Sequence, residues 1–366
     1  MEVTERRRFR WSQFLFICFL AASVPASAVA QSGSDRIVPT TNVVATGYGT
    51  VGYVYRTDGD NENEFTAAFN PIFLYQFEDK ILFETEFEFA LEGGVTETGL
   101  EYAQIDYIAS DALVLVAGKF LLPFGVFGER LHPTWINKFP TAPPVFGHHV
   151  SEFGREPIIP VLSGIGLMAR VTVRPGPARI ALNAYVTNGP ATEEGDEGIP
   201  ELVFPSSSED NNTNKMVGGR LDLALGMAEV NVSFFNADYD ENNVLDLTGW
   251  NVAGEYRYDR LSVRGEYIQL RQEFETFEGF PTIRRHGLYA QAAYRVGNWE
   301  PVLRWTSLFD TKIDGVVEER GAYQVGIGLD YWVSPSAAIM AGYEINREED
   351  GEVGNDRMVI HFAFGF

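Results

Sequence analysis

Cysteine is almost absent from this chain of 366 residues, and its single copy is Cys18. Cys18 lies inside an apolar run, Phe14–Val24, which follows a cluster of arginines and precedes the small residues Ala28–Ala30. These three features in this order are typical of a cleaved export signal. We therefore expect residues 1–30 to be removed, leaving a mature chain with neither disulfides nor thiol chemistry.

Basic residues and long apolar runs are scarce as well. Lys and Arg total 28 against 51 Asp and Glu, a formal net charge of −23, which argues against nucleic acid as a partner. After residue 30, no apolar run reaches the roughly eighteen residues that a membrane helix needs. A membrane location therefore requires a closed β-barrel, because a bilayer leaves no backbone group without a hydrogen-bond partner.

The abundant feature is alternation of apolar and polar residues. In the last segment, Met358–Phe366, the even positions are bulky and apolar, whereas the odd positions between them are mostly small or polar. Residues 81–92 alternate in the same way, largely with phenylalanines against glutamates. A soluble sandwich also shows this pattern, but the export signal and the wide aromatic faces favour strands between lipid and water. A last strand that ends in Phe366 also resembles the signal read by the barrel-assembly machinery of the outer membrane.

About sixteen such segments follow one another, joined by short and long connections in alternation. They lie near residues 42–56, 65–77, 81–92, 102–107, 113–120, 165–171, 179–186, 216–225, 228–237, 247–258, 261–271, 286–296, 299–307, 321–333, 337–346 and 358–366. This order predicts an all-β fold, a transmembrane antiparallel β-barrel of about 16 strands. Residues 31–366 would form it as one domain, with both termini on the periplasmic side and a width that leaves an aqueous channel.

One segment, at about 121–160, breaks the alternation. Its many prolines exclude a long helix or a central strand, and its Phe and Trp residues exclude a solvated linker. Loops of this length are usually functional. We expect an inward-folded third external loop that constricts the barrel; a lid over the barrel mouth is the alternative.

Five segments carry a family resemblance when they are taken together. They are Gly118–Gly125, Arg130–Lys138, Val186–Gly189, Gly287–Val296 and Trp299–Arg304. They look like the phosphate-selective porin O and P family of bacterial outer-membrane porins. The resemblance implies a sixteen-stranded, homotrimeric porin with a constricting third loop. It does not imply phosphate selectivity, which needs a dense ladder of Arg and Lys, whereas the polar faces here are mixed and partly acidic.

The expected function is passive diffusion of small hydrophilic solutes or ions through a water-filled channel of the Gram-negative outer membrane. An occluded barrel that acts as an adhesin, receptor or structural tether is the alternative. The candidate pore-lining and constriction residues are the charged groups on the polar faces and in the loop: Lys119, Arg130, His132, Lys138, Glu84, Glu86, Glu88, Asp106, Arg170, Arg179, Arg220, Arg264 and Arg304.

These charges are unevenly distributed along the chain. The glutamates near residue 86 have no basic partner on their own strands, whereas most of the arginines come from later strands. We therefore expect a transverse field across the constriction, acidic on one side and basic on the other. Two pairs on single strands, Arg220 with Asp222 and Arg264 with Glu266, are expected to neutralise part of the basic side.

No enzymatic activity, metal or cofactor is expected. The adjacent His148 and His149 are poorly placed to share one ion, and no calcium-loop spacing occurs. Ser151 lies near these histidines, but nothing marks an oriented base or an oxyanion site. The expected partners are outer-membrane lipid, lipopolysaccharide and two further copies of the chain. Close packing between copies would use small outward residues, namely Gly47, Gly49, Ala103 and Gly118.

Overall fold

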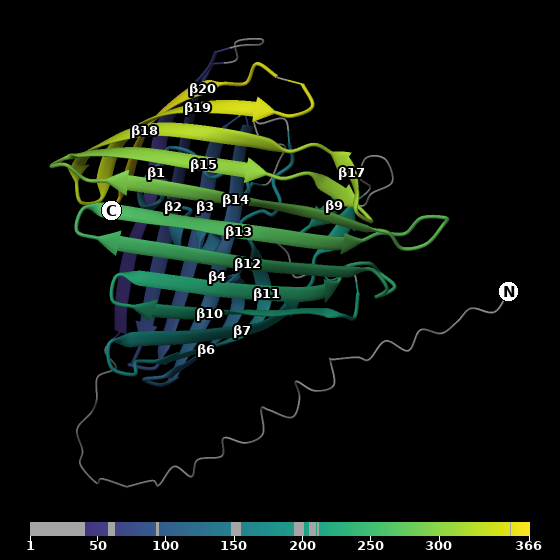
Figure 1. Cartoon of the computed structure of the whole chain (residues 1–366). Helices are drawn as coiled ribbons and strands as arrows, with labels where there is room; N and C mark the ends of the chain where they lie inside the picture. Colours follow the sequence, from purple (N-terminus) through teal and green to yellow (C-terminus); the bar gives the residue numbers. More distant parts are fainter. Residues whose placement is uncertain are drawn as a thin grey trace, which may run out of the picture. The chain divides into compact units, whose positions relative to one another are not determined.

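The computed structural model describes residues 41–57, 63–92, 95–147, 155–193, 201–204, 210, 212–351 and 353–366. The expected signal segment 1–30, with Cys18, lies outside these residues, as do His148, His149 and Ser151. Nearly all of the described chain is antiparallel β-structure (Figure 1). No helix among these residues is long and apolar enough to cross a membrane.

One sheet contains 18 strands. Two of them are short, β16 (Thr311–Ile313) and β17 (Val316–Glu319), and form a hairpin that pairs with β14 through β16. The other sixteen strands are long. These are β1 (Thr41–Arg56), β2 (Glu64–Phe77), β3 (Ile81–Glu92), β4 (Val95–Ser110), β5 (Leu113–Leu121), β6 (Ser163–Val173), β7 (Ala178–Asn188), β10 (Lys215–Leu225), β11 (Ala228–Asp238), β12 (Asp246–Tyr258), β13 (Leu261–Glu273), β14 (Thr282–Tyr294), β15 (Trp299–Leu308), β18 (Ala322–Ser334), β19 (Ala337–Glu348) and β20 (Arg357–Gly365). A separate small hairpin pairs β8 (Ala191–Glu193) with β9 (Glu201–Val203).

The sheet closes on itself because β1 pairs with β2 on one side and with β20 on the other. In that closing seam Val51 lies opposite Phe362, and the backbone N–H of Phe366 donates to the carbonyl of Gly47 at 3.0 Å. Closure gives each of the sixteen described long strands a neighbour on both sides, which is the condition for a sheet that lies in lipid. The predicted antiparallel barrel of sixteen strands is therefore confirmed.

The alternation of the sequence sorts side chains between two faces. On β20, Met358, Ile360 and Phe362 are exposed on the outer face, whereas Val359 and Ala363 are fully buried on the inner one. The other strands expose a comparable outer belt of Phe, Tyr, Leu, Val and Ile. This apolar outer surface matches hydrocarbon, and the polar residues between these positions face the barrel interior.

The alternation is interrupted within β4, which begins seven residues before the predicted start. Tyr102 lies opposite Glu86 and Leu100 lies opposite Phe87, so Glu101 is an extra residue in the ladder. Such a bulge reverses the phase of in–out alternation. Sequence periodicity therefore recognises only the part of β4 that follows Glu101.

Short turns and long connections lie at opposite ends of the barrel. Turns such as residues 78–80, 226–227 and 259–260 lie at the same end as the C-terminus, whereas the longer connections extend from the other end (Figure 1). Long connections are typical of the external side of outer-membrane barrels and short turns of the periplasmic side. We refer to these ends as the external and the periplasmic end.

The small residues expected to allow barrel–barrel packing are placed differently. Gly47 has a φ of +156°, and a Cβ there would lie 2.4 Å from the carbonyl oxygen of Asn70 and 2.9 Å from the ring of Phe366. Gly49 is covered by Phe364 in the same way. These glycines thus accommodate aromatic rings of their own chain. Gly118 pairs with the buried Gln104 on the inner face, so the expected outward position of Gly118 is wrong.

Candidate functional site in the barrel interior

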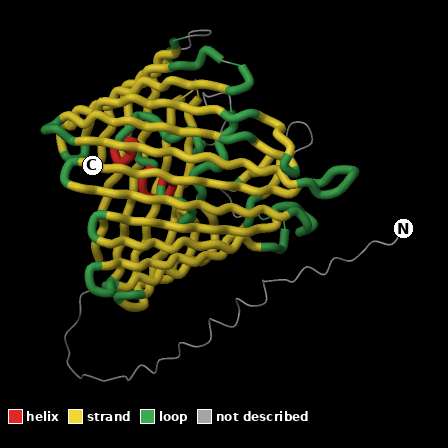
Figure 2. The backbone as a smooth tube through the Cα atoms, in the orientation of Figure 1, coloured by secondary structure: helices red, strands yellow, loops and turns green. Residues whose placement is uncertain are grey.

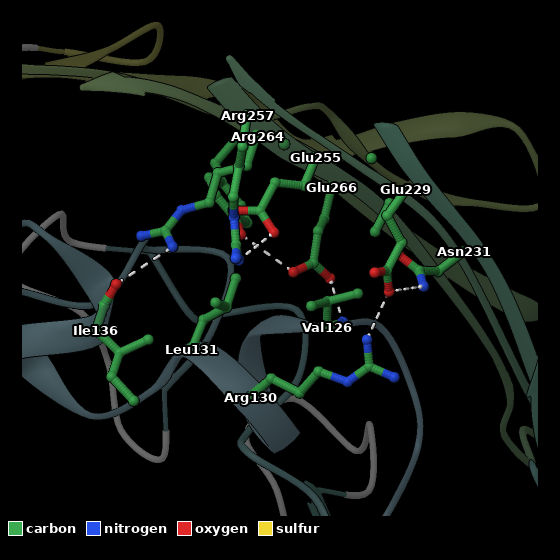
Figure 3. Close-up of a pocket in the computed structure, with 14 residues that line it drawn as sticks. Val126, Arg130, Leu131, Ile136, Glu229, Asn231, Glu255, Arg257, Arg264 and Glu266 are labelled. Carbon is green, nitrogen blue, oxygen red and sulfur yellow. Dashed lines mark hydrogen bonds and ion pairs between the residues drawn. The ribbon is translucent and has the colours of Figure 1, made fainter. Parts of the chain in front are cut away.

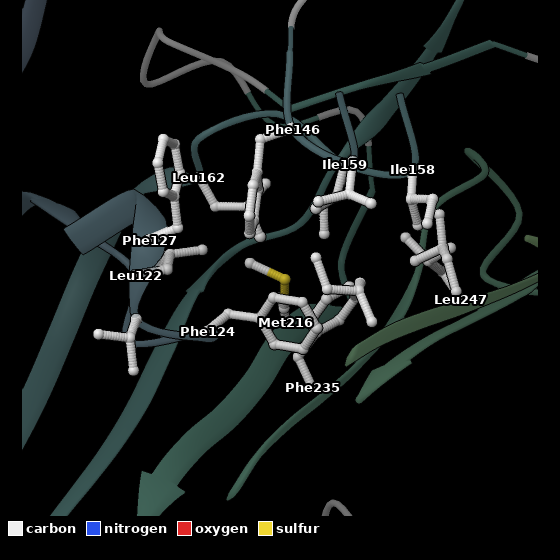
Figure 4. Close-up of a cluster of buried hydrophobic side chains, with 14 of the residues drawn as sticks. Leu122, Phe124, Phe127, Phe146, Ile158, Ile159, Leu162, Met216, Phe235 and Leu247 are labelled. Atoms are coloured by element: carbon white, nitrogen blue, oxygen red, sulfur yellow. The ribbon is translucent and has the colours of Figure 1, made fainter. Parts of the chain in front are cut away.

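We call the described residues of the connection between β5 and β6, 122–147 and 155–162, the lumenal loop. It contains one π-helical turn, η3 (Phe127–Leu131), and one α-helical turn, α1 (Thr134–Asn137). Phe127 stacks on Phe146 with ring centroids 4.7 Å apart, and Phe124 meets Phe235 of β11 at 4.9 Å (Figure 4). Both helical turns lie within the ring of strands (Figure 2). The aromatic residues of the loop therefore form an apolar core against the inner wall.

The carboxylate of Glu266 on β13 holds the start of η3. It accepts a hydrogen bond from the backbone N–H of Val126 at 3.0 Å (Figure 3). It also accepts one from the N–H of Phe127 at 2.6 Å and further ones from Asn251 and Tyr289. These N–H groups have no partner inside the helical turn, so a buried carboxylate satisfies them.

Gly125 makes this approach possible at the preceding position. It has a φ of +68°, and a Cβ there would lie 2.4 Å from Oε2 of Glu266. Its own N–H donates to Oγ of Ser233 at 2.8 Å. Only glycine combines this backbone conformation with so close a contact.

Arg264, two residues before Glu266 on the same strand, holds the other end of the helical region. Its guanidinium donates to the carbonyls of Ile136 and Asn137 and, at 3.1 Å, to Oδ1 of Asn137. Gln291 donates to the Asn137 carbonyl at 2.6 Å. The positive group thus meets the C-terminal carbonyls of α1, and the negative group meets N–H donors. No ion pair between Arg264 and Glu266 accompanies these contacts, so the expected neutralisation within this pair is wrong.

Arg304 on β15 holds the segment that follows α1. Its fully buried guanidinium donates to the Thr141 carbonyl at 2.5 Å and pairs with Glu344 of β19 at 2.9 Å. It also lies 4.1 Å from the ring centroid of Phe139, a cation–π contact. Beside it, Lys138 pairs with Glu300 at 2.8 Å. The loop is therefore held by charged groups along its whole helical part.

A neutral cluster of three cations and three anions surrounds η3. Arg130 pairs with Asp222 at 3.0 Å and with Glu229 at 2.6 Å, while Arg220 pairs with Asp222 at 2.9 Å and also with Glu129. Arg179 contributes a further pair with Glu229 at 2.9 Å. The expected Arg220–Asp222 pair is thus present within a larger network.

This network sets the charge of Glu129. Burial alone would raise the pKa of its carboxyl group, but the guanidinium groups of Arg220 and Arg130 hold the pKa below its ordinary value. Glu129 therefore remains ionised at neutral pH.

His132 joins the loop to the opposite seam of the barrel. Its Nδ1 donates to the carbonyl of Gly128 at 2.6 Å, and its Nε2 lies 2.9 Å from the hydroxyl of Tyr48 on β1. Tyr48 in turn donates to Glu86 at 2.6 Å. Burial lowers the pKa of His132 to about 4, so the imidazole is neutral at physiological pH.

The contacts described above join the lumenal loop to β1, β10, β11, β13, β14, β15 and β19; β3 and β4 contribute none of them. On these two strands Glu84, Glu88 and Glu101 keep part of their surface exposed and form no ion pair with a described residue. We call these three residues the acidic strip. Asp106 beside them pairs with Arg170 at 3.4 Å. The acidic strip therefore lies on the wall that the loop leaves uncovered.

The candidate residues separate into two groups by burial. Lys119, Glu86, Arg220, Arg264 and Arg304 are each at most 7% exposed, so they do not line a water path. Four of them hold the loop or its partners, and Lys119 donates to the carbonyl of Leu100. Asp106 is 6% exposed and belongs to the same buried group, whereas Glu84, Glu88, Arg130, His132, Lys138, Arg170 and Arg179 are partly exposed. Side chains that fix a buried loop thus account for much of the charge expected in the channel.

Some residues of the site have a weak sequence signal. Asn137, Glu129 and Glu344 are buried hydrogen-bonding groups of the loop and its wall, and Tyr48 connects His132 to Glu86. The pairing of an irregular loop with distant strands follows no short spacing. The available signal is the segment Pro123–Gly125, whose glycine binds Ser233 and directly precedes the N–H groups that Glu266 binds.

Residues 170–351 match the family described as Gram-negative porin. The protein is an outer-membrane porin. It forms a channel for passive diffusion of solutes and is an integral protein of the Gram-negative outer membrane. An uncharacterized protein of Aquifex aeolicus (strain VF5) is 25% identical over 340 residues, which cover 84% of this chain and 70% of that protein.

Several solved porin structures share the fold of this porin. Salmonella typhi OmpF in complex with daunomycin has a TM-score of 0.59 at 12% identity, covering 88% of this chain and 97% of that one. The anion-selective porin from Comamonas acidovorans has a TM-score of 0.58 at 12% identity, covering 89% and 100%. The trimer form of OmpT from Vibrio cholerae has a TM-score of 0.59 at 11% identity, covering 89% and 99%. At these identities the likeness concerns the fold alone.

Proposed function

We propose that the lumenal loop constricts this porin and that solutes pass between the loop and the acidic strip. The loop is bonded to the strands from β10 round to β1, and its aromatic residues fill the space on that side. Glu84, Glu88 and Glu101 remain on the opposite wall with water-accessible surface. The single observation that carries the proposal is this one-sided attachment of the loop.

The charge balance at this constriction favours cations modestly. The basic groups that the loop offers are already neutralised, Arg130 by Asp222 and Glu229, and Lys138 by Glu300. The acidic strip forms no ion pair with a described residue, although Lys119 lies near Glu88 and Glu101 and Arg170 lies near Glu84. The field across the constriction is therefore dominated by its acidic side, and salt screens it over roughly 8 Å at physiological ionic strength.

Phosphate selectivity does not follow from this arrangement. The resemblance to the phosphate-selective porin O and P family supports the barrel and the constricting loop. An acidic strip at the narrowest passage repels a phosphate dianion, however. We therefore propose small cations and polar or zwitterionic solutes as the favoured permeants.

Assembly of the porin is proposed on other grounds. A homotrimer is supported by the family resemblance and by the trimer form of the structurally similar Vibrio cholerae OmpT. Residues 1–30 would direct export, and the β20 strand with Phe366 would engage the barrel-assembly machinery. Light scattering of the detergent-solubilised porin tests the trimer, and a mass near one protomer would contradict it.

The test of the channel is a planar-bilayer recording in asymmetric KCl. The wild-type porin should give stable, stepwise conductance with a reversal potential on the cation-selective side. The double variant Glu84→Gln/Glu88→Gln should move the reversal potential toward zero at low salt. The matched control is Glu241→Gln/Glu278→Gln, which removes two exposed acids from external connections.

Three outcomes would contradict the proposal. Absence of conductance from correctly folded, heat-modifiable porin would indicate an occluded barrel that serves as an adhesin, receptor or tether. An anion-selective wild type would show that the acidic strip does not dominate the passage. An equal shift in the acidic-strip variant and in the control would show that the strip is not at the constriction.

A further inference from the structure

Three cations lie side by side on the outer surface of the barrel near its external end. Arg271 of β13 pairs in register with Arg284 of β14, and Arg284 pairs with Lys312 of β16. Val263 and Tyr294, at matching positions of the alternation on these two strands, are exposed to lipid. The register therefore places three positive side chains in one line on the lipid-facing side. We call these three residues the basic row.

Such a row is unfavourable without an anion. Like charges directly opposite one another on neighbouring strands destabilise the pair. None of the three cations forms an ion pair or a side-chain hydrogen bond with a described residue. On the same rim, Arg320 pairs with Asp310 at 3.5 Å and Arg347 with Asp356 at 2.9 Å. The basic row thus differs from these neighbouring cations in forming no ion pair with a described carboxylate.

The basic row lines a cavity of about 280 Å³, together with Gln269, Thr282, Asp314 and Gly315. Asp314 is the one acid in this lining, and its Oδ1 accepts the backbone N–H of Thr282 at 3.0 Å. Its charge offsets one of the three cations, so the lining carries a net charge of two positive units. Gln269 and Thr282 add neutral polar groups to the same cavity.

A row of aromatic rings indicates the position of the cavity along the membrane normal. Trp250 lies 5.0 Å from Tyr267, Tyr267 lies 6.0 Å from His286, and His286 lies 4.9 Å from Phe309, all between ring centroids. Aromatic belts of this kind lie at the boundary between hydrocarbon and headgroups. Tyr267 is four residues from Arg271 and His286 is two from Arg284, both toward the periplasmic end. At about 3.3 Å per residue, the basic row therefore lies roughly 7–13 Å beyond the aromatic rings, at the level of lipid headgroups.

We propose that the basic row binds a phosphate group on the headgroup of a phosphorylated glycolipid of the outer leaflet. Arginine presents paired donors that match phosphate oxygens, and Lys312 adds a third positive charge. Positive groups at the headgroup level attract anionic lipids, and each contributes roughly fivefold to binding. The acyl chains of the same lipid would then pack along the apolar outer faces of β13 and β14. The site is separate from the channel and does not depend on the proposed constriction.

The experiment measures lipid bound to the purified, folded porin in detergent by native mass spectrometry, with bisphosphorylated lipid A as the probe. Wild-type porin should bind it, and the triple variant Arg271→Gln/Arg284→Gln/Lys312→Gln should bind it about a hundredfold more weakly. The control Lys80→Gln/Arg174→Gln/Arg260→Gln removes three exposed cations near the periplasmic end and should bind like wild type. Heat-modifiable migration and unchanged single-channel conductance establish that both variants are folded.

Further probes identify the chemistry that is recognised. Lipid A from which both phosphates have been removed should bind the wild type as weakly as lipid A binds the triple variant. Equal binding of both lipids, or full binding by the triple variant, would overturn the proposal. Displacement of lipid A by an equimolar amount of inorganic phosphate would also overturn it, because the site would then recognise free phosphate rather than a lipid.

Discussion

Glu266→Gln is the substitution that separates the attachment of the lumenal loop from the charge of the channel. The wild-type carboxylate accepts the N–H groups of Val126 at 3.0 Å and Phe127 at 2.6 Å. A glutamine has the same shape, but its single carbonyl oxygen satisfies one N–H group while its NH₂ group faces the other donor. The loop therefore loses one charge-assisted hydrogen bond, and the remaining one becomes a neutral bond.

The expected size of the effect follows from those two bonds. A hydrogen bond to a charged group contributes about 1.5–3 kcal/mol, against about 1 kcal/mol for a neutral one. We therefore expect Glu266→Gln to destabilise the attached state of the loop by about 2–5 kcal/mol. At the lower end of this range the ratio of detached to attached loop already rises roughly 30-fold. The strand pairing of the barrel does not involve this side chain, so the barrel itself should remain folded.

Single-channel recording and liposome swelling provide the measurements. The variant should show more frequent conductance fluctuations and should admit larger neutral sugars than the wild type. Glu255→Gln is the matched control, because it removes one carboxylate from the neighbouring strand β12 whose side-chain bonds go to Arg257 rather than to the loop. Fluctuations and a size limit indistinguishable from Glu255→Gln would refute the view that Glu266 fastens the loop.

Three further predictions concern other parts of the porin. Burial in the attached loop lowers the pKa of His132 from 6.5 to about 4. Between these two pH values His132 binds a proton in the released loop but not in the attached one, so attachment should weaken as pH falls from 6.5 toward 4. Channel fluctuations across that range should increase in the wild type and stay flatter in His132→Gln. Arg304→Met removes the ion pair with Glu344 and the hydrogen bond to the Thr141 carbonyl, although Glu344 keeps its pair with Arg357, and should lower the free energy of unfolding by about 3 kcal/mol, measured by urea unfolding in lipid vesicles. Phe366→Asp removes the ring stacked on Phe69 at 5.6 Å and should reduce outer-membrane levels without blocking export; normal levels in membrane fractions would contradict this.

The barrel was predictable because lipid imposes one rule on every strand. Each strand must show an apolar residue outward at every second position, and Phe83, Phe87 and Phe89 display that rule in the sequence itself. The rule fails locally where a bulge adds a residue, as at Glu101, and the predicted start of β4 failed there. Strand number and connection order were recoverable for the same reason: each strand carries its own signal.

The candidate site was less predictable, because its contacts join positions that no repeat relates. The alternation of apolar and polar residues predicts that the charged side chains of Arg264 and Arg304 face the barrel interior. Their partners, the carbonyls of Asn137 and Thr141, are backbone groups and carry no sequence signature. The spacing of Arg264 and Glu266 predicts an ion pair, yet each group binds a different end of the same helical region.

The loop itself explains why so many inward charges are buried. A segment with little regular secondary structure leaves many of its N–H and C=O groups unpaired, and a buried segment must find partners for them. The wall supplies these partners with Glu266 for donors and with Arg264 and Arg304 for acceptors. A charged side chain that binds the loop is neutralised by its partner or covered by the loop, so it contributes little to the electrostatic field that acts on a solute. We therefore propose that the channel is governed by the charges that the loop leaves uncovered, Glu84, Glu88 and Glu101, although the arginines outnumber them along the inner wall.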